Sequence, residues 1–261
     1  MKLNKKVDIF TLCMLLIIAI IYAFLVDGTI IDIPVLSSYI FLIPPIIYLS
    51  IREKKDWKKI GAITFLLGFV VGFPFTFLGE LTDAWAIHVA KQKMFGVFYF
   101  PIVIAWMLMT TLTVVMYQHF YIESNNVLKG LSRRYNKIAV ILIIISVIIV
   151  IVCLYKPSFF TKKYSYLIIG SVNLFPFLVY LLKRPKFILK VTPLILYFFI
   201  LYFSIEFVGL KLKWWSFEGS YIGFVDLIGI TFPIEEFVYW MVLYAPSTIF
   251  CYESFVNKSK L

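Results

Sequence analysis

The chain alternates between long apolar stretches and short polar connections, and this pattern predicts membrane-spanning helices. Each apolar block has about 18 to 25 residues, the length that crosses a ~30 Å hydrocarbon core at 1.5 Å per residue. The predicted spans are 8–26, 30–51, 60–79, 95–118, 138–155, 165–182, 189–206 and 221–251. The first block has no small-x-small cleavage site before Asp27, so we expect a retained helix. The last block contains Gly223, Gly229 and Pro233, so we expect it to begin as an interfacial or kinked segment.

Basic residues are distributed unevenly between the two sets of connections. The set that contains the N-terminus and the tail carries 18 Lys and Arg, and the opposite set carries 7. Positive charge in short loops marks the cytoplasmic side. We therefore expect a multi-pass protein of the cell membrane with both termini in the cytoplasm.

Composition agrees with this prediction, because 62% of the residues are hydrophobic and only 15% are charged. A soluble domain is about half apolar and about a quarter charged. The fold class expected is an all-α, polytopic membrane bundle of about eight helices. The net charge of +11 lies in short clusters between apolar blocks, which argues against a nucleic-acid partner.

The sequence carries no recognisable metal or cofactor motif. Cys13, Cys153 and Cys251 lie singly in apolar blocks without a CxxC spacing, and the chain has only two histidines. We interpret His88 as a loop residue and His119 as a residue at a membrane boundary. No glycine-rich phosphate loop follows a strand, so we expect neither a metal nor a nucleotide cofactor.

Two stretches of the chain, one in each half, resemble each other. Phe100-Pro101-Ile102 leads to Trp106-Met107, and Phe232-Pro233-Ile234 leads to Trp240-Met241. Upstream, Glu80 and Trp85 have looser counterparts in Glu206 and Trp215. The pattern predicts two fused four-helix modules, 1–130 and 131–261, with a site between them. A chance similarity in an aromatic-rich chain is the alternative.

Two adjacent acids in the last predicted span are the strongest candidates for chemistry. One charged acid at mid-membrane costs roughly 2.5–3.5 kcal/mol, so we expect Glu235 or Glu236 to be held protonated and able to donate a proton. Pro233 would kink the helix beside them. Tyr239 and Trp240 each follow one acid by four residues and would share its helix face. The alternative is an acid pair that only fixes helix packing.

A second group of acids lies near the outer ends of the predicted spans. Its members are Glu80, Asp83, Glu206, Glu218 and Asp226. Three tryptophans are interleaved with them, namely Trp85, Trp214 and Trp215. Solvated acids and an interfacial aromatic belt are the alternatives to a functional site here.

The segment from Trp214 to Trp240 resembles the lycopene cyclase domain family of integral-membrane carotenoid cyclases. The matching residues are Trp214-Trp215-Ser216-Phe217, Tyr221-Ile222-Gly223 and Gly229-Ile230-Thr231-Phe232-Pro233-Ile234-Glu235-Glu236-Phe237-Val238-Tyr239-Trp240. The rest of the chain matches the family only in hydropathy. The resemblance implies a hydrophobic polyene or isoprenoid substrate, proton addition to an end-group double bond, ring closure through a carbocation, and proton loss.

Carried over by position, the resemblance makes Glu235 and Glu236 the acid/base pair and Trp214 or Trp215, with Phe217, part of the pocket. Asp226 and Glu206 are further pocket candidates. The first copy has apolar residues where a second acid pair is expected, so either Glu80 and Asp83 contribute from the outer end, or a partner subunit does, or that half is a scaffold.

Three other functions are alternatives to carotenoid cyclisation. An enzyme acting on another isoprenoid lipid would use the same acids. A transporter or assembly protein would use the acid pair as an ion or proton site, but the predicted fifth and sixth spans offer few polar residues for a pathway. An intramembrane protease with a Glu-Glu-x-x-x-Arg motif is disfavoured because position 240 is tryptophan.

Overall fold

The structure is a computed structural model that describes residues 4–27, 34–52, 55–88, 100–121 and 163–256, with isolated positions between 140 and 156. Most of this backbone is helical, as expected. The helices are α1 (Lys5–Leu25), α2 (Pro34–Arg52), α3 (Trp57–Ile63), α4 (Gly72–Leu81), α5 (Phe100–Tyr121), α7 (Ser165–Lys183), α8 (Lys186–Lys211) and α9 (Tyr244–Cys251), with π-helical turns η1 (Thr64–Val71), η3 (Glu236–Val242) and η4 (Tyr252–Val256). The short strands are β1 (Ala86–Ile87), β2 (Trp215–Ser216), β3 (Phe224–Leu227) and β4 (Ile230–Pro233).

Five helical stretches in the described residues are long and apolar enough to cross a membrane. They are Lys5–Leu25, Trp57–Leu81, Pro101–Tyr121, Ser165–Lys183 and Lys186–Lys211, and the apolar helix Ser37–Arg52 is shorter. Large apolar side chains such as Phe10, Ile18 and Phe175 are more than half exposed, as on a lipid-facing surface. The chain is therefore a helical membrane protein. Most of the predicted span 138–155 lies outside the described ranges. The predicted module boundary between residues 130 and 131 lies wholly outside them.

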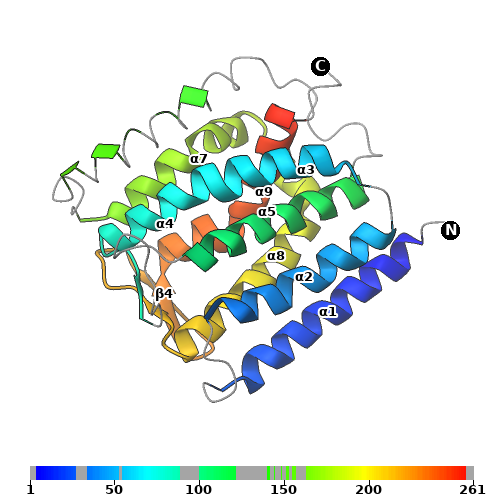
Figure 1. Ribbon diagram of the computed structural model, residues 1–261, viewed down its shortest axis with the longest axis horizontal. Helices are drawn as coiled ribbons and strands as arrows, with labels where there is room; N and C mark the ends of the chain where they lie inside the picture. The colour runs from blue at the N-terminus through cyan, green and yellow to red at the C-terminus, as the bar shows by residue number, and fades with distance from the viewer. Residues whose placement is uncertain are drawn as a thin grey trace.

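The helices lie side by side as roughly aligned rods (Figure 1). Across the front of that view α1, α2, α5, the α3–α4 helix and α7 follow one another, and α8 and α9 lie behind them. α8 packs against α1 and α2, and α9 packs against α5 and α7. Helices from the two ends of the chain are therefore joined in one bundle, with one main apolar core between them.

The third helical rod is continuous from Trp57 to Leu81 but widens into the π-helical turn η1 at its centre. A Cβ atom added to Gly68 in this turn would lie 2.7 Å from the backbone of Met107 on α5. The two backbones approach so closely here that only glycine fits. The turn therefore fixes how the third rod packs on α5.

One end of the bundle is held by a buried ionic cluster. Asp8 is fully buried on α1, and its Oδ1 accepts hydrogen bonds from the hydroxyl of Tyr48 at 2.7 Å and from Nε of Arg52 at 2.6 Å. Its Oδ2 lies 3.0 Å from Nε2 of His119, whose Nδ1 lies 3.2 Å from Nζ of Lys55. His119 is thus a buried member of a charged network linking α1, α2 and α5, and the interpretation as a simple boundary residue was incomplete.

At the opposite end, α4 and α8 terminate in the same way. Each helix ends with a left-handed residue, Asp83 at φ 55° and Lys213 at φ 55°. The next residue's N–H then donates back to a glycine carbonyl, from Ala84 to Gly79 at 2.9 Å and from Trp214 to Gly209 at 2.8 Å. The segments that follow these two helix ends pair as the antiparallel strands β1 and β2.

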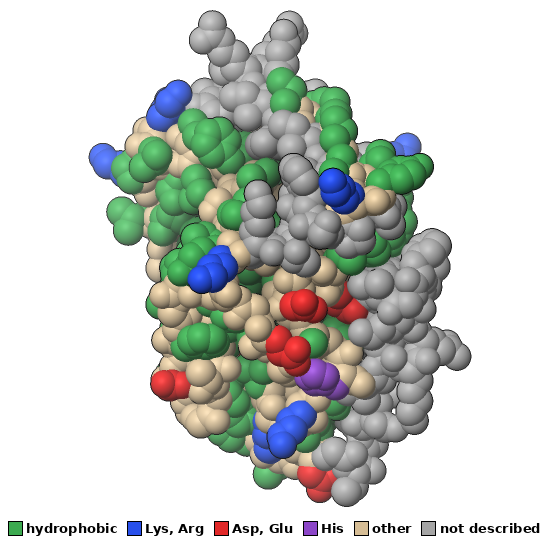
Figure 2. Space-filling model, turned by 90° about the vertical axis from the view of Figure 1, so that its left-hand side faces the viewer, with side chains coloured by type: hydrophobic (Ala, Val, Ile, Leu, Met, Phe, Trp, Pro, Cys, Tyr) green, Lys and Arg blue, Asp and Glu red, His purple; other side chains and the backbone are tan. Residues whose placement is uncertain are grey.

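Loops and strands cover this second end of the molecule. Figure 2, which looks at the left-hand side of the view in Figure 1, shows acidic side chains and a histidine near the middle of this surface, with basic side chains above and below them. Tyr221 ties the loop after β2 to the loop after α4, because its hydroxyl donates to the carbonyl of Ala84 and accepts from the N–H of Gly219 at 2.9 Å. Burial raises the pKa of Tyr221 to about 12.

The prediction for the last span was wrong over its first third. Residues 224–233 form an antiparallel hairpin, with Ile228 and Gly229 at φ 51° and 79° in its two-residue turn. Positive φ at both turn residues suits the twist of a tight hairpin. The glycine therefore marks a turn between strands, and Pro233 ends β4 immediately before the helix begins at Ile234. Pro233 does not kink that helix.

Candidate functional site

Two buried acids from different helices line one cavity near the loop-covered end. Glu206 on α8 and Glu236 at the start of η3 are only 3% and 8% exposed, and both face a cavity of about 110 Å³. We call it the acid cavity. Its remaining wall is largely aromatic and apolar, with Phe75, Trp85 and Trp215 among its members. Carboxyl groups in such surroundings are costly to ionise, so the cavity suits chemistry in which a proton is donated to an apolar molecule.

The carboxyl group of Glu236 is held by a tyrosine from α7. The hydroxyl of Tyr166 donates to Oε2 of Glu236, and the ring of Tyr166 packs edge-on against Trp85 with centroids 5.2 Å apart. Glu236 begins the π-helical turn η3, and such turns occur frequently at functional sites because they redirect side chains. Tyr166 is therefore the residue that orients this acid.

The carboxyl group of Glu206 is held by a tryptophan that rests on a glycine. Nε1 of Trp215 donates to Oε1 of Glu206 at 2.7 Å. The indole covers Gly209 so closely that an added Cβ would lie 1.9 Å from a ring carbon. The absence of a side chain at position 209 therefore sets the position of Trp215, and Trp215 in turn orients Glu206.

Glu235 and Glu236 diverge instead of forming a side-by-side pair. Oε1 of Glu235 accepts from the backbone N–H of Ile222 at 2.8 Å, and Ile234 donates to the carbonyl of Gly223 at 3.0 Å. These bonds fasten the preceding loop to the start of the helix. Both acids lie in the first turn of the last helix, which begins at Ile234, and not near its middle.

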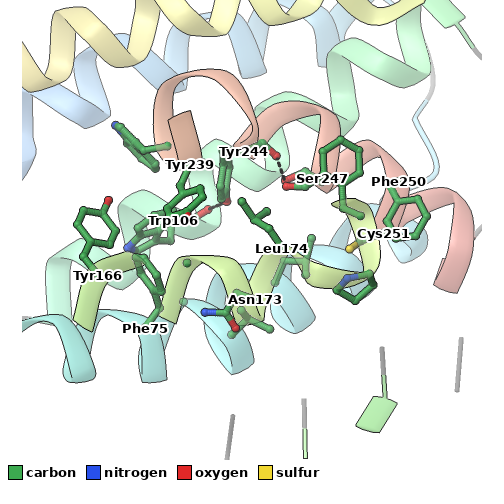
Figure 3. Close-up of a pocket in the computed structure, with 18 residues that line it drawn as sticks. Phe75, Trp106, Tyr166, Asn173, Leu174, Tyr239, Tyr244, Ser247, Phe250 and Cys251 are labelled. Atoms are coloured by element: carbon green, nitrogen blue, oxygen red, sulfur yellow. Dashed lines mark hydrogen bonds between the residues drawn. The ribbon is translucent and has the colours of Figure 1, made fainter. Parts of the chain in front are cut away.

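A second, longer cavity lies beside the first, between α7, α9 and the third helical rod. It has a volume of about 140 Å³ and none of its described lining residues is charged. Figure 3 shows Tyr166 and Trp106 toward one end, Leu174 near the middle, and Phe250 and Cys251 at the other end. We call it the long cavity. An apolar cavity of similar size, about 150 Å³, binds benzene, so its volume and lining suit a hydrocarbon group.

Four aromatic residues belong to the walls of both cavities, namely Phe75, Trp106, Tyr166 and Trp240. The indoles of Trp106 and Trp240 meet edge to face with centroids 4.6 Å apart, and Trp240 also stacks on Tyr202 at 4.6 Å. Within the described residues, the buried Nε1 of Trp240 has no hydrogen-bond partner. The acid cavity and the long cavity are thus neighbours divided by one aromatic wall.

The predicted site residues fall into two groups. Six line one or both cavities: Glu206, Trp215, Phe217, Glu236, Tyr239 and Trp240. The other six are not among the described lining residues: Glu80, Asp83, Trp214, Asp226, Pro233 and Glu235. Asp83 and Asp226 are exposed, and Oδ1 of Asp226 accepts from the hydroxyl of Thr231 across the hairpin. Glu80 and Trp214 are buried.

Sequence reasoning missed three wall residues, Phe75, Trp106 and Tyr166, as members of the site. Trp106 belongs to the internal similarity, but that pattern does not place it at the site. Phe75 and Tyr166 carry no signal of their own in a chain with 27 Phe and 17 Tyr. Only their positions opposite Glu236 distinguish them.

Several contacts join residues separated by a constant number of positions. Trp106 contacts Trp240, the hydroxyl of Thr110 lies 2.7 Å from that of Tyr244, and Nε2 of Gln118 donates to the hydroxyl of Tyr252 at 3.0 Å. The two members of each pair have sequence numbers that differ by 134. The left-handed residues Asp83 and Lys213 differ by 130 positions. Trp85 covers Gly79 as Trp215 covers Gly209, and these two contacts are also 130 positions apart.

Among the described residues, no group of three or more His, Cys, Asp or Glu side chains is arranged to hold a metal ion. The described cysteines, Cys13 and Cys251, are free thiols. No family model, curated protein or solved structure matches the chain.

Proposed function

We propose that the chain is a membrane enzyme that closes the end group of a linear isoprenoid polyene into a ring by acid catalysis. The observation that carries this proposal is the pair Glu206 and Glu236, two buried carboxyl groups that face one aromatic cavity. Substrates dissolved in the bilayer are apolar, and their double bonds need a proton donor to react. The resemblance of residues 214–240 to the lycopene cyclase domain family points to the same chemistry.

The proposed reaction is an isomerisation that uses one acid and one base. A protonated carboxyl group adds its proton to a terminal carbon–carbon double bond, which leaves a tertiary carbocation. A neighbouring double bond attacks that cation with its electron pair and closes the ring. The other carboxyl group, ionised, then removes a proton from the ring, so that atoms and electrons balance without an oxidant or reductant.

The arrangement of Glu206 and Glu236 suits this division of roles. Two carboxyl groups that share an apolar cavity repel each other when both are charged, so one holds a proton while the other is ionised. Each already accepts one hydrogen bond, from Trp215 or from Tyr166, and so has an oxygen left for the substrate. Glu235 is bonded to the backbone N–H of Ile222 and is not among the lining residues of the acid cavity. The proposed pair is therefore Glu206 and Glu236.

The aromatic wall supports the proposed cation. A positive charge near the face of an indole or phenyl ring is stabilised by roughly 0.5–2 kcal/mol per favourable contact. Phe75, Trp106, Trp215, Phe217 and Trp240 all line the acid cavity. Rings stabilise a cation without offering a strong nucleophile that would trap it.

We further propose that the bundle consists of two fused four-helix modules of eight spans, with both termini in the cytoplasm. The two constant sequence spacings between paired residues support the modules, and the loop charges support the orientation. By these spacings, Glu206 corresponds to Thr76 and Glu236 to Ile102. The acid pair then belongs to the second module alone, which gives one site for each chain.

The test is pigment analysis in a bacterial host that accumulates lycopene. The unmodified chain is expected to produce cyclic carotenoids, and Glu236→Gln and Glu206→Gln are expected to lower product formation at least ~100-fold, the lower range for a lost acid or base. Glu218→Gln is the matched control, because Glu218 is exposed and does not line the acid cavity. Membrane abundance is measured for each variant.

Two outcomes would contradict the proposal. Unchanged lycopene from a well-inserted parent chain would rule out cyclisation of this polyene. Full activity of Glu206→Gln beside an inactive Glu236→Gln would reject the acid/base pair and leave Glu236 acting alone.

A further inference from the structure

The long cavity is elongated along α7. Both Tyr166 and Phe177 line it, and they are separated by eleven residues, which is about 16 Å of helix at 1.5 Å per residue. Leu174 lies between these two ends (Figure 3). The shape therefore fits a chain better than a compact ligand.

The lining of the long cavity changes along its length. Near the acid cavity it is made of rings, including Phe75, Trp106 and Trp240, whereas Asn173, Ser247 and Thr248 lie farther along. No carboxyl group, histidine, lysine or arginine is among its described lining residues. This cavity is thus suited to holding a molecule and not to transforming it.

The shared wall relates the two cavities to each other. The long cavity lies on the other side of the rings of Phe75, Trp106, Tyr166 and Trp240, so it is the adjoining apolar space for the rest of a linear molecule whose end lies in the acid cavity. The buried Nε1 of Trp240, which lacks a partner in the described part of the chain, lies in this wall. An N–H group can donate weakly to a π system, so it favours an unsaturated chain over a saturated one.

We propose that the long cavity is the binding site for the chain of an unsaturated isoprenoid, and that the aromatic wall admits only the chain's end group to Glu206 and Glu236. This inference rests on the proposed function for the identity of the reacting end. Binding in the long cavity itself needs no chemistry and is measured separately.

The experiment uses the full-length chain, purified in detergent, as the catalytically blocked variant Glu236→Gln. All-trans-lycopene is achiral, and it acquires a visible circular dichroism band when a protein holds it in an asymmetric site. Titration with lycopene gives its affinity without turnover. Leu174→Trp fills the middle of the long cavity and Cys251→Phe fills its far end, and each is expected to weaken binding at least tenfold.

Ile168→Trp is the matched control, because Ile168 lies on the same helix, is half exposed and does not line the long cavity. It is expected to bind lycopene like the parent. Squalene, an unsaturated isoprenoid, is expected to displace lycopene at a lower concentration than its saturated counterpart squalane does. Thermal unfolding of each variant checks that the fold is intact.

The outcomes separate this inference from the proposed function. Lycopene binding that is lost in folded Leu174→Trp and kept in Ile168→Trp supports the chain site, whether or not the parent makes cyclic product. Equal affinity of Leu174→Trp and the parent overturns it even if the parent is an active cyclase. Equal displacement by squalane and squalene would show a site for any apolar chain and would overturn the assignment to unsaturated isoprenoids.

Discussion

Gly209 provides a direct test of how Glu206 is oriented. In Gly209→Ala the new Cβ would lie 1.9 Å from a ring carbon of Trp215, whereas ordinary contact begins at 3.4 Å. The indole must therefore move by about 1.5 Å, which is 3.4 minus 1.9. A shift of that size stretches its 2.7 Å hydrogen bond to Glu206 beyond bonding distance.

The expected cost is the sum of two effects. Overpacking a well-filled site costs roughly 1–3 kcal/mol, and losing one hydrogen bond costs roughly 0.5–1.5 kcal/mol. At roughly 2–4 °C per kcal/mol for a chain of this size, Tm should fall by at least about 3 °C. The measurement is thermal unfolding in detergent, followed by tryptophan fluorescence. If the proposed function holds, product formation falls as well, because Glu206 loses its orienting donor.

Two further glycines control this test. A Cβ at Gly61 would meet nothing within 4 Å, so Gly61→Ala is expected to be neutral or slightly stabilising. Gly79→Ala meets Trp85 at the same 1.9 Å and should destabilise the fold without touching the Trp215–Glu206 bond. If Gly209→Ala unfolds at the same temperature as Gly61→Ala, the indole does not rest on Gly209 and the reasoning fails.

Two other predictions concern the two ends of the bundle. Asp8→Asn replaces the charged acceptor of the bonds from Arg52 and Tyr48 with a neutral one and should cost roughly 1.5–3 kcal/mol; thermal unfolding beside the helix-cap control Asp56→Asn measures it, and equal Tm values would contradict it. Tyr221→Phe loses the bond to the loop after α4 and should cost about 1 kcal/mol at pH 7. Because the pKa of Tyr221 is raised to about 12 in the folded state, the tyrosine's stabilising contribution is complete below pH ~10 and declines as pH rises from there to 12. The difference in Tm between parent and Tyr221→Phe should therefore narrow over that range, and a constant difference would refute the reasoning.

Much of the bundle could be predicted from the sequence, because long apolar blocks in a chain of this composition have few structures open to them. The observed bounds of α1, α7 and the Trp57–Leu81 helix lie within a few residues of the predicted spans. The hairpin of residues 224–233 was missed because its residues are apolar enough to extend the neighbouring block. Ile228-Gly229 is a weak turn signal, since a β-branched residue is unusual at positive φ.

The candidate site was predictable in kind but not in membership. Acids next to aromatic residues in an apolar segment indicated buried carboxyl chemistry, and Glu206 and Glu236 were both among the candidates. Which acids face each other depends on how α8 packs against the last helix, and no local pattern encodes that. Tyr166 could not be found from the sequence, because its role follows only from its position opposite Glu236.

The contacts between α5 and the C-terminal helix have a consequence for how the protein is made. At roughly 5–20 residues per second, a ribosome adds Tyr252 roughly 7–27 s after Gln118. During that interval the face of α5 that will meet the last helix lies in the membrane without its native neighbour. The hydroxyl of Thr110 has a hydrogen-bond partner during this interval, because it also donates to the carbonyl of Trp106 one turn away. The side-chain oxygen of Gln118 already accepts from the backbone N–H of Asp56, but its NH2 group must spend those seconds with lipid headgroups, water or an assisting protein before Tyr252 arrives.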